Sequence, residues 1–216
     1  MIDKNMKLIQ NNQKQIDLLE EKAKLIYNKV NTGKLNKFII DDVINIIDGP
    51  GIGRNQHKSS GIRLVNVRLF HNDEFNFNTS NFIDQLEVEK KYKKYLLKEN
   101  DILVVAATTV LGKSVLVRSN HLPLLLNVHL YRLTPKEPLN TWYLKAYITH
   151  GGFKEKLKSV TSGSIVIGSN KNNIKLLNIG LPNINTLCDI EEQFSEIYSK
   201  KKALLDENHK IMHADS

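Results

Sequence analysis

The sequence has a single cysteine, Cys188, among 216 residues. One thiol excludes both an intramolecular disulfide and a zinc site built from several cysteines. The chain also lacks any run of about 18 apolar residues, so we expect no transmembrane helix. The polar stretch 1–7 contains no apolar core of a secretory signal. Together these absences favour a cytoplasmic location.

Motifs of known catalytic sites are also missing. The seven histidines show no metal-ligand spacing, Gly-x-Ser-x-Gly is absent, and no two carboxylates stand out as an acid and a base. Residues 107–114 end in Gly-Lys-Ser like a phosphate-binding loop, but Ala107 replaces the first glycine and the following residues predict a strand. The glycines of 49–54 have the wrong spacing for a dinucleotide site. The sequence therefore favours a binding protein over an enzyme, and it predicts no cofactor and no metal.

Apolar residues recur every seventh position at both ends of the chain. The N-terminal series is Ile2, Ile9, Ile16, Ala23 and Val30, and the C-terminal series is Ile190, Ile197, Leu204 and Ile211. This repeat is typical of helices that pack along each other as a coiled coil. We therefore predict one helix over 3–31 and another from about Asp189 onward.

A coiled-coil repeat has two positions that face the partner helix. If Ile9, Ile16 and Ala23 of the N-terminal helix occupy one of them, the other is occupied by Asn12, Leu19 and Ile26. An asparagine at such a position lowers stability but fixes the register of the pair. Leu18 and Leu25 widen the apolar stripe, which predicts that this helix also contacts the middle of the chain.

The net charge of +8 is distributed unevenly. Residues 1–34 hold seven Lys and four acids (+3), 35–182 hold twenty Lys or Arg and twelve acids (+8), and 183–216 hold four Lys and seven acids (−3). The opposite charges of the two ends favour their pairing. The excess positive charge of the middle is typical of surfaces that bind polyanions such as nucleic acid. A solvated basic surface with no such partner is the alternative explanation.

Between the two helices, the sequence predicts a domain of mixed strands and helices. Strands are predicted over 62–69, 102–106, 115–117, 125–133, 164–167 and 174–179, and helices within 80–98 and over 140–150. The segment 38–47 fits either a helix or a strand, and 48–61 is a polar loop. The chain thus divides into an N-terminal helix (1–34), a central domain (35–182) and a C-terminal helix (183–216).

Four stretches resemble a known family. They are 18–33, ending in Val30-Asn-Thr-Gly33; 47–62, from Ile47-Asp-Gly-Pro50 to Ser60-Gly61-Ile62; 98–103, with Asn100 replacing the glycine of a Gly-Asp-Ile-Leu turn; and 161–193, with Thr161-Ser-Gly-Ser164, Leu177–Pro182 and Glu192-Gln193. In this order they resemble the specificity subunit of type I restriction-modification enzymes, in particular one target-recognition domain with its helical spacers. The chain departs from the family at Asn183, where a second proline is usual, and in having one recognition domain instead of two.

The resemblance implies an α+β fold, in which a mixed α/β DNA target-recognition domain is flanked by long N- and C-terminal helices that form an antiparallel coiled coil. It implies a non-catalytic subunit that reads one half of a bipartite site on double-stranded DNA and docks methyltransferase and restriction subunits. It also implies a partner joined through the helices, either a second copy in a homodimer or another half-subunit. A non-catalytic coiled-coil adaptor, with a basic head and no sequence-specific DNA binding, is the alternative.

The residues expected to contact DNA lie in loops and at strand ends of the central domain. Candidates for phosphate contacts are Arg54, Lys58, Arg63, Arg68, Lys113, Arg118, Lys154 and Lys158, since both side chains neutralise phosphate and Arg also pairs with guanine. Candidates for base edges are Asn55, Gln56, Asn66, Thr108, Thr109 and Ser162, since Asn and Gln pair with adenine and hydroxyls pair with several bases. Any one of them alone is equally explained as a solvated surface residue, so the hypothesis concerns the cluster.

Overall fold

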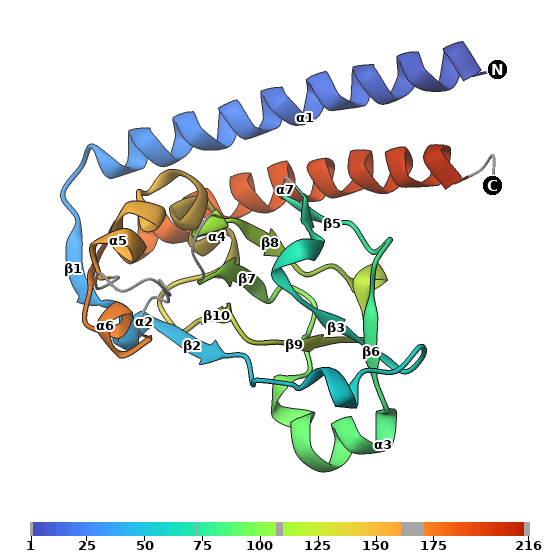
Figure 1. Ribbon diagram of the computed structural model, residues 1–216. Helices are drawn as coiled ribbons and strands as arrows, with labels where there is room; N and C mark the ends of the chain where they lie inside the picture. Colours follow the sequence, from blue (N-terminus) through green and yellow to red (C-terminus); the bar gives the residue numbers. More distant parts are fainter. Residues whose placement is uncertain (1, 72, 107–109, 161–170, 214–216) are drawn as a thin grey trace.

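The computed structural model describes residues 2–71, 73–106, 110–160 and 171–213 (Figure 1). Two long helices, α1 (Ile2–Asn31) and α7 (Ile184–His213), lie along one side of the molecule, with the start of α1 and the end of α7 at the same end. We call the residues between these helices the head. In the described part of the chain, no helix is long and apolar enough to cross a membrane.

The apolar repeat packs α1 against α7. Ile16 and Ala23 of α1 are buried, as are Ile190 and Ile197 of α7. The amide of Asn12 donates hydrogen bonds to Asn208 Oδ1 and to Glu207 Oε2, each at 2.9 Å. Because this bond joins the start of α1 to the end of α7, the helices are antiparallel, and the predicted antiparallel pairing is confirmed.

One detail of the helix prediction is wrong. The second helix begins at Ile184 rather than near Asp189, because the Asn183 side chain accepts a hydrogen bond from Thr186 N at 3.0 Å and caps its first turn. Leu18 and Leu25 are themselves largely exposed, at 65% and 63%, but Ala23 and Tyr27 of α1 belong to the core of the head, so the predicted contact of this helix with the middle of the chain is confirmed. The boundaries of the three predicted regions stay a prediction.

Replacing Asn12 with alanine is expected to lower the free energy of unfolding by about 1–3 kcal/mol, because the buried Asn208 amide loses its partner. Joint replacement of Asn12 and Asn208 with leucine should restore stability while removing the bond that fixes the register. Urea unfolding of the two single variants and the double variant measures this coupling. Gln13→Ala, which changes an exposed position on the same helix, is the control, and equal effects of Gln13→Ala and Asn12→Ala would contradict the prediction.

A four-stranded antiparallel sheet forms the centre of the head. Its strands, in spatial order, are β2 (Ile44–Asp48), β10 (Leu130–Pro135), β7 (Ile102–Val105) and β8 (Ser114–Leu116). Side chains alternate between the two faces of a strand. Ile102 and Val104 accordingly belong to one hydrophobic cluster, and Leu103 and Val105 to another. The sheet therefore separates two layers of core.

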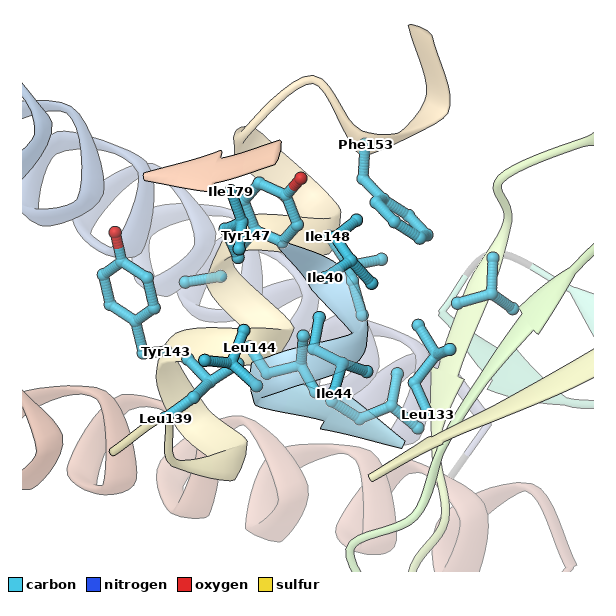
Figure 2. Close-up of a cluster of buried hydrophobic side chains, with 14 of the residues drawn as sticks. Ile40, Ile44, Leu133, Leu139, Tyr143, Leu144, Tyr147, Ile148, Phe153 and Ile179 are labelled. Carbon is cyan, nitrogen blue, oxygen red and sulfur yellow. The ribbon is translucent and has the colours of Figure 1, made fainter. Parts of the chain in front are cut away.

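The first layer joins the head to the long helices. It contains α4 (Thr141–His150) and α5 (Phe153–Ser159), together with α2 (Ile40–Val43), α6 (Lys171–Lys175) and the paired strands β1 (Asn36–Ile39) and β11 (Asn178–Leu181). Figure 2 shows Tyr143, Leu144 and Tyr147 of α4 gathered with Ile40 and Ile44. Ala23 of α1 and Phe194 of α7 belong to the same cluster. Half of each long helix is thus part of the core of the head.

The second layer is built from short strands. A three-stranded sheet has the order β6 (Asn81–Ile83), β3 (Ile62–Val65), β9 (Leu124–Leu126), with β3 parallel to β9, and β4 (Phe70–His71) pairs with β5 (Glu74–Phe75). The helix α3 (Gln85–Glu87) continues as a π-helix over Val88–Tyr92 and a 3₁₀ turn over Lys93–Tyr95. In Figure 1, α3 lies at the end of the head farthest from α1 and α7. We call 85–95 the distal helical segment.

The structure confirms some predicted elements and corrects others. The helix over 140–150 is confirmed, with Asn140 Oδ1 accepting a hydrogen bond from Tyr143 N at 2.8 Å. The predicted strand 62–69 ends at Val65, and 125–133 is two strands separated by a turn in which His129 has a φ of 67°. Residues 38–47 form a strand, a helical turn and a second strand. The predicted strand 174–179 instead contains the end of α6, which stops at Lys175, and the start of β11 at Asn178. The predicted strand 164–167 lies outside the described residues.

Asn100 occupies the left-handed conformation, with a φ of 68°. Glycine adopts this conformation without strain, and asparagine is among the other residues that tolerate it. We expect Asn100→Gly to leave the free energy of unfolding unchanged or to raise it, and Asn100→Val to lower it by roughly 1–2 kcal/mol. Chemical denaturation of both variants checks this expectation. Equal stabilities of the two variants would contradict it.

Candidate nucleic-acid interface

Exposed cations gather on the end of the head that lies farthest from the long helices. The short 3₁₀ turn η1 (Arg54–Gln56) lies against the distal helical segment there. We call the following exposed residues the distal basic surface: Arg54, Asn55, Lys58, Lys90, Lys91, Lys93 and Lys94. Six cations on neighbouring elements provide the charge that phosphate groups require.

Gln56 fixes η1 to the distal helical segment. Its amide nitrogen donates to Glu87 Oε1 at 3.0 Å and to Tyr92 Oη at 2.9 Å, and its oxygen accepts from Gly53 N at 3.0 Å. The backbones of Lys58 and Phe82 also exchange two hydrogen bonds, at 2.8 and 3.3 Å. These bonds place Arg54 and Lys58 beside the lysines of 90–94. They also occupy the Gln56 amide, which argues against its predicted role in reading a base edge.

Arg132 fixes the other end of the distal helical segment. From the central strand β10, its guanidinium donates to the carbonyl oxygens of Leu96 at 2.8 Å and Lys94 at 3.2 Å. Asp101 lies 3.9 Å from the same guanidinium, and burial raises the pKa of Asp101. Hydrogen bonds that involve a charged donor are stronger than neutral ones. The lysines are therefore carried on a segment that is bound at both ends.

The cations of the distal basic surface are only lightly paired. Lys91 Nζ lies 2.9 Å from Glu87 one helical turn earlier, and this hydrogen bond raises the pKa of Lys91 and lowers the pKa of Glu87. Lys94 Nζ lies 4.9 Å from the centre of the Tyr95 ring. A solvated pair of this kind contributes little to stability. Lys91 therefore gives up little stability if it moves from Glu87 to a phosphate.

Three further candidates of the sequence analysis are near the second core layer. The Arg63 guanidinium lies 4.2 Å from the centre of the Phe77 ring and 5.5 Å from that of Phe82, and Arg68 is exposed. Asn66 Oδ1 accepts a hydrogen bond from Arg68 N at 3.0 Å and caps the 3₁₀ turn Val67–Leu69. The Asn66 side chain thus has a structural partner in addition to any base contact.

Arg118 is not placed as predicted. Its exposed fraction is 7%, and its guanidinium bonds to Glu74 and, at 2.9 Å, to Asp206 of α7. It also bonds to the His121 ring at 3.0 to 3.1 Å. A buried guanidinium with two carboxylate partners is not available to phosphate, so the prediction for Arg118 is corrected.

Lys113, Lys154 and Lys158 form a second exposed group. Gly112 packs directly on Lys154, since an added Cβ would lie 2.9 Å from the Lys154 Cβ atom, so the turn between β7 and β8 meets α5. Figure 1 shows α5 well separated from α3, so the predicted cluster divides between two places. Thr108, Thr109 and Ser162 lie outside the described residues.

The sequence analysis did not assign Lys90, Lys91, Lys93 and Lys94 to the interface. A signal was present, because 90–95 reads Lys-Lys-Tyr-Lys-Lys-Tyr, a basic run interleaved with aromatic rings. Such a run also fits an ordinary solvated helix face. The tertiary bonds of Gln56 to Glu87 and of Lys58 to Phe82 identify these lysines as neighbours of Arg54 and Lys58.

Fold and surface together define a mixed α+β head with a basic distal end, carried on two antiparallel helices. Within the described residues, no group of three His, Cys, Asp or Glu side chains is arranged to hold a metal ion. No protein-family model matches the chain, and no curated protein matches it by sequence. The classification of the fold therefore depends on solved structures.

Three solved structures have this fold in one half of their chains. The HsdS subunit from Thermoanaerobacter tengcongensis matches with a TM-score of 0.59 and 14% identity over 97% of this chain and 54% of that one. The type I restriction-modification S subunit from M. genitalium matches with a TM-score of 0.53 and 10% identity over 97% and 55%. A chain from a structural study of complex assembly and conformational transition of the type I R-M system matches with a TM-score of 0.54 and 15% identity. This match covers 99% of this chain and 55% of that one. The chain spans about half the length of each, and the likeness shows the fold.

Proposed function

We propose that this chain is a sequence-specific DNA-binding specificity subunit of a type I restriction-modification system, and that it reads one half of a bipartite site. The observation that carries the proposal is the distal basic surface, which lies on a head with the fold of one half of an S subunit. Lys and Arg contacts to phosphate position a protein on duplex DNA, and side-chain amides read base edges. Arg54 and Asn55 supply both functions at one turn.

The long helices support the proposed pairing with a second head. A mainly apolar groove on their outer side is lined by Gln15, Leu18, Leu19 and Lys22 of α1 and by Lys200, Ala203 and Leu204 of α7. Exposed Leu25 lies two turns along α1 from Leu18. We propose that this face takes a second copy or another half-subunit, and that methyltransferase and restriction subunits supply the chemistry in the cytoplasm. Measurement of the solution mass tests the homodimer. A mass of one chain at all concentrations across the micromolar range would contradict it.

Selection of bound sequences from a random duplex pool tests the DNA function. The full chain, alone and with methyltransferase subunits, is expected to enrich a short motif, or two short motifs separated by a gap of fixed length. The adaptor alternative predicts that no sequence is enriched in either state. That result would refute the specificity role even if the protein bound DNA in a salt-dependent way.

A further inference from the structure

The contact between α7 and the head changes character along the helix. Up to Tyr198, α7 is held by buried apolar side chains, among them Leu187, Phe194 and Ile197, which belong to the first core layer. Beyond Tyr198, no residue of α7 belongs to a hydrophobic cluster of the described chain. A cavity of about 280 Å³ opens between α7 and the head at this point. Another kind of contact therefore holds the next two turns.

Ion pairs replace the apolar contact there. Lys201 of α7 bonds to Glu20 of α1 and, at 3.0 Å, to Asp73 in the turn between β4 and β5. One turn further, Asp206 Oδ1 lies 2.9 Å from Arg118 Nη1, and Arg118 also bonds to Glu74 of β5. We call these six residues the helix–head polar cluster: Glu20, Asp73, Glu74, Arg118, Lys201 and Asp206. It joins both long helices to one β-hairpin of the head.

The two cations of this cluster are buried, with exposed fractions of 7% each. Burial opposes the charge of Lys201, but Asp73 and Glu20 outweigh that effect and raise the pKa of Lys201. Burial likewise opposes the charge of Asp73, yet Lys145 and Lys201 lower the pKa of Asp73. Lys201 and Asp73 are therefore both charged at neutral pH. Buried charged pairs require a defined geometry, because a misplaced partner leaves a charge without solvation or a counter-charge.

We propose that Arg118 and Lys201 are positioning residues, which set the angle between the helix pair and the DNA-reading end of the head. Apolar burial is non-directional, whereas a buried charge needs its partner within bonding distance. With the cluster intact, the outer parts of α1 and α7 point in one direction relative to the distal basic surface. In an assembly with two heads, this angle fixes the distance between the half-sites. The last step rests on the proposed function, whereas the angle itself does not.

Distance measurement between two spin labels tests the angle without DNA. The labels are placed at Ser59→Cys in the head and Lys210→Cys on α7, both exposed positions, with Cys188→Ser removing the native thiol. The parent, diluted into an excess of unlabelled chain so that each measured pair lies within one chain, is expected to give one narrow distance distribution. Arg118→Met and Lys201→Met should broaden it or shift its mean. Gln193→Met is the control, because Gln193 is exposed on α7 and its side chain bonds, at 3.3 Å, to the backbone oxygen of Asp189 in the same helix.

Unchanged distributions in both Arg118→Met and Lys201→Met, with the fold intact by circular dichroism, would overturn the inference. Duplex selection then tests the consequence for DNA. The wild-type chain should enrich one gap length, and Lys201→Met should enrich the same bases over several gap lengths. Retention of one gap length by Lys201→Met would count against the positioning role. Enrichment of no motif by the wild type would instead refute the proposed function and leave the label distances as the test of the angle.

Discussion

Replacement of Lys90, Lys91, Lys93 and Lys94 by alanine is expected to weaken binding to duplex DNA by up to about 10³-fold at 0.1 M salt. The physical reason is counterion release, because each phosphate neutralised by a cation releases bound counterions from DNA. Loss of four such contacts should reduce the slope of log affinity against log salt by roughly 3.6. Fluorescence anisotropy at four or more salt concentrations measures both quantities.

The matched control removes the same charge from another place. Lys4, Lys14, Lys24 and Lys29 are exposed on α1, and their joint replacement by alanine changes the net charge by the same amount. We expect a much smaller loss of affinity for this variant, because α1 lies at the opposite end of the molecule from α3 (Figure 1). Equal losses in the two variants would show that binding depends on overall charge and would remove the distal basic surface from the account.

Phe194→Ala is expected to lower the free energy of unfolding by about 3–5 kcal/mol. The Phe194 side chain is fully buried, and its ring centre lies 6.4 Å from that of Tyr143 and 6.3 Å from that of Tyr198. Since small proteins are stable by only about 5–15 kcal/mol, the loss is a large fraction of the total. The size of the effect reflects that α7 closes the core of the head.

Urea unfolding followed by circular dichroism measures this loss, with Ile184→Ala as the control. Ile184 is on the same helix but is exposed, so its replacement should change stability by less than about 0.5 kcal/mol. One cooperative transition, shifted to lower urea in Phe194→Ala, is the expected result. A separate early transition of α7, with the head unfolding at its original midpoint, would contradict the shared core.

The parts of the fold that were predictable are those encoded by local periodicity. The seven-residue repeat of Ile9, Ile16 and Ala23 is visible in the sequence and survives as the contact between α1 and α7. The strands are different, because several have only two to four residues and their partners lie far away in the chain. Strand β3 pairs with β9 some sixty residues later, at a register that takes Arg63 to Leu124. No local pattern specifies such a pairing.

The candidate site was predictable to a similar extent. Composition and loop position drew attention to Arg54, Asn55 and Lys58, all of which the structure leaves exposed. The functions of Gln56 and Arg118 were not visible, because both depend on tertiary partners. Gln56 is occupied by Glu87 and Tyr92, and Arg118 is buried by carboxylates from a hairpin and from α7. A sequence shows that a residue is able to bind a phosphate, but it does not show whether the folded protein already occupies that side chain with another partner.

Hydrogen exchange with and without bound DNA tests the central claim most directly, namely that the distal basic surface is the DNA-reading surface. The full chain is compared free and bound to the duplex that it selects from a random pool. We predict slower exchange of backbone amides in 54–58 and 85–95 on binding, with little change in the exposed middle of α1. Protection confined to α5 and the turn between β7 and β8, with 54–58 and 85–95 unchanged, would contradict the account.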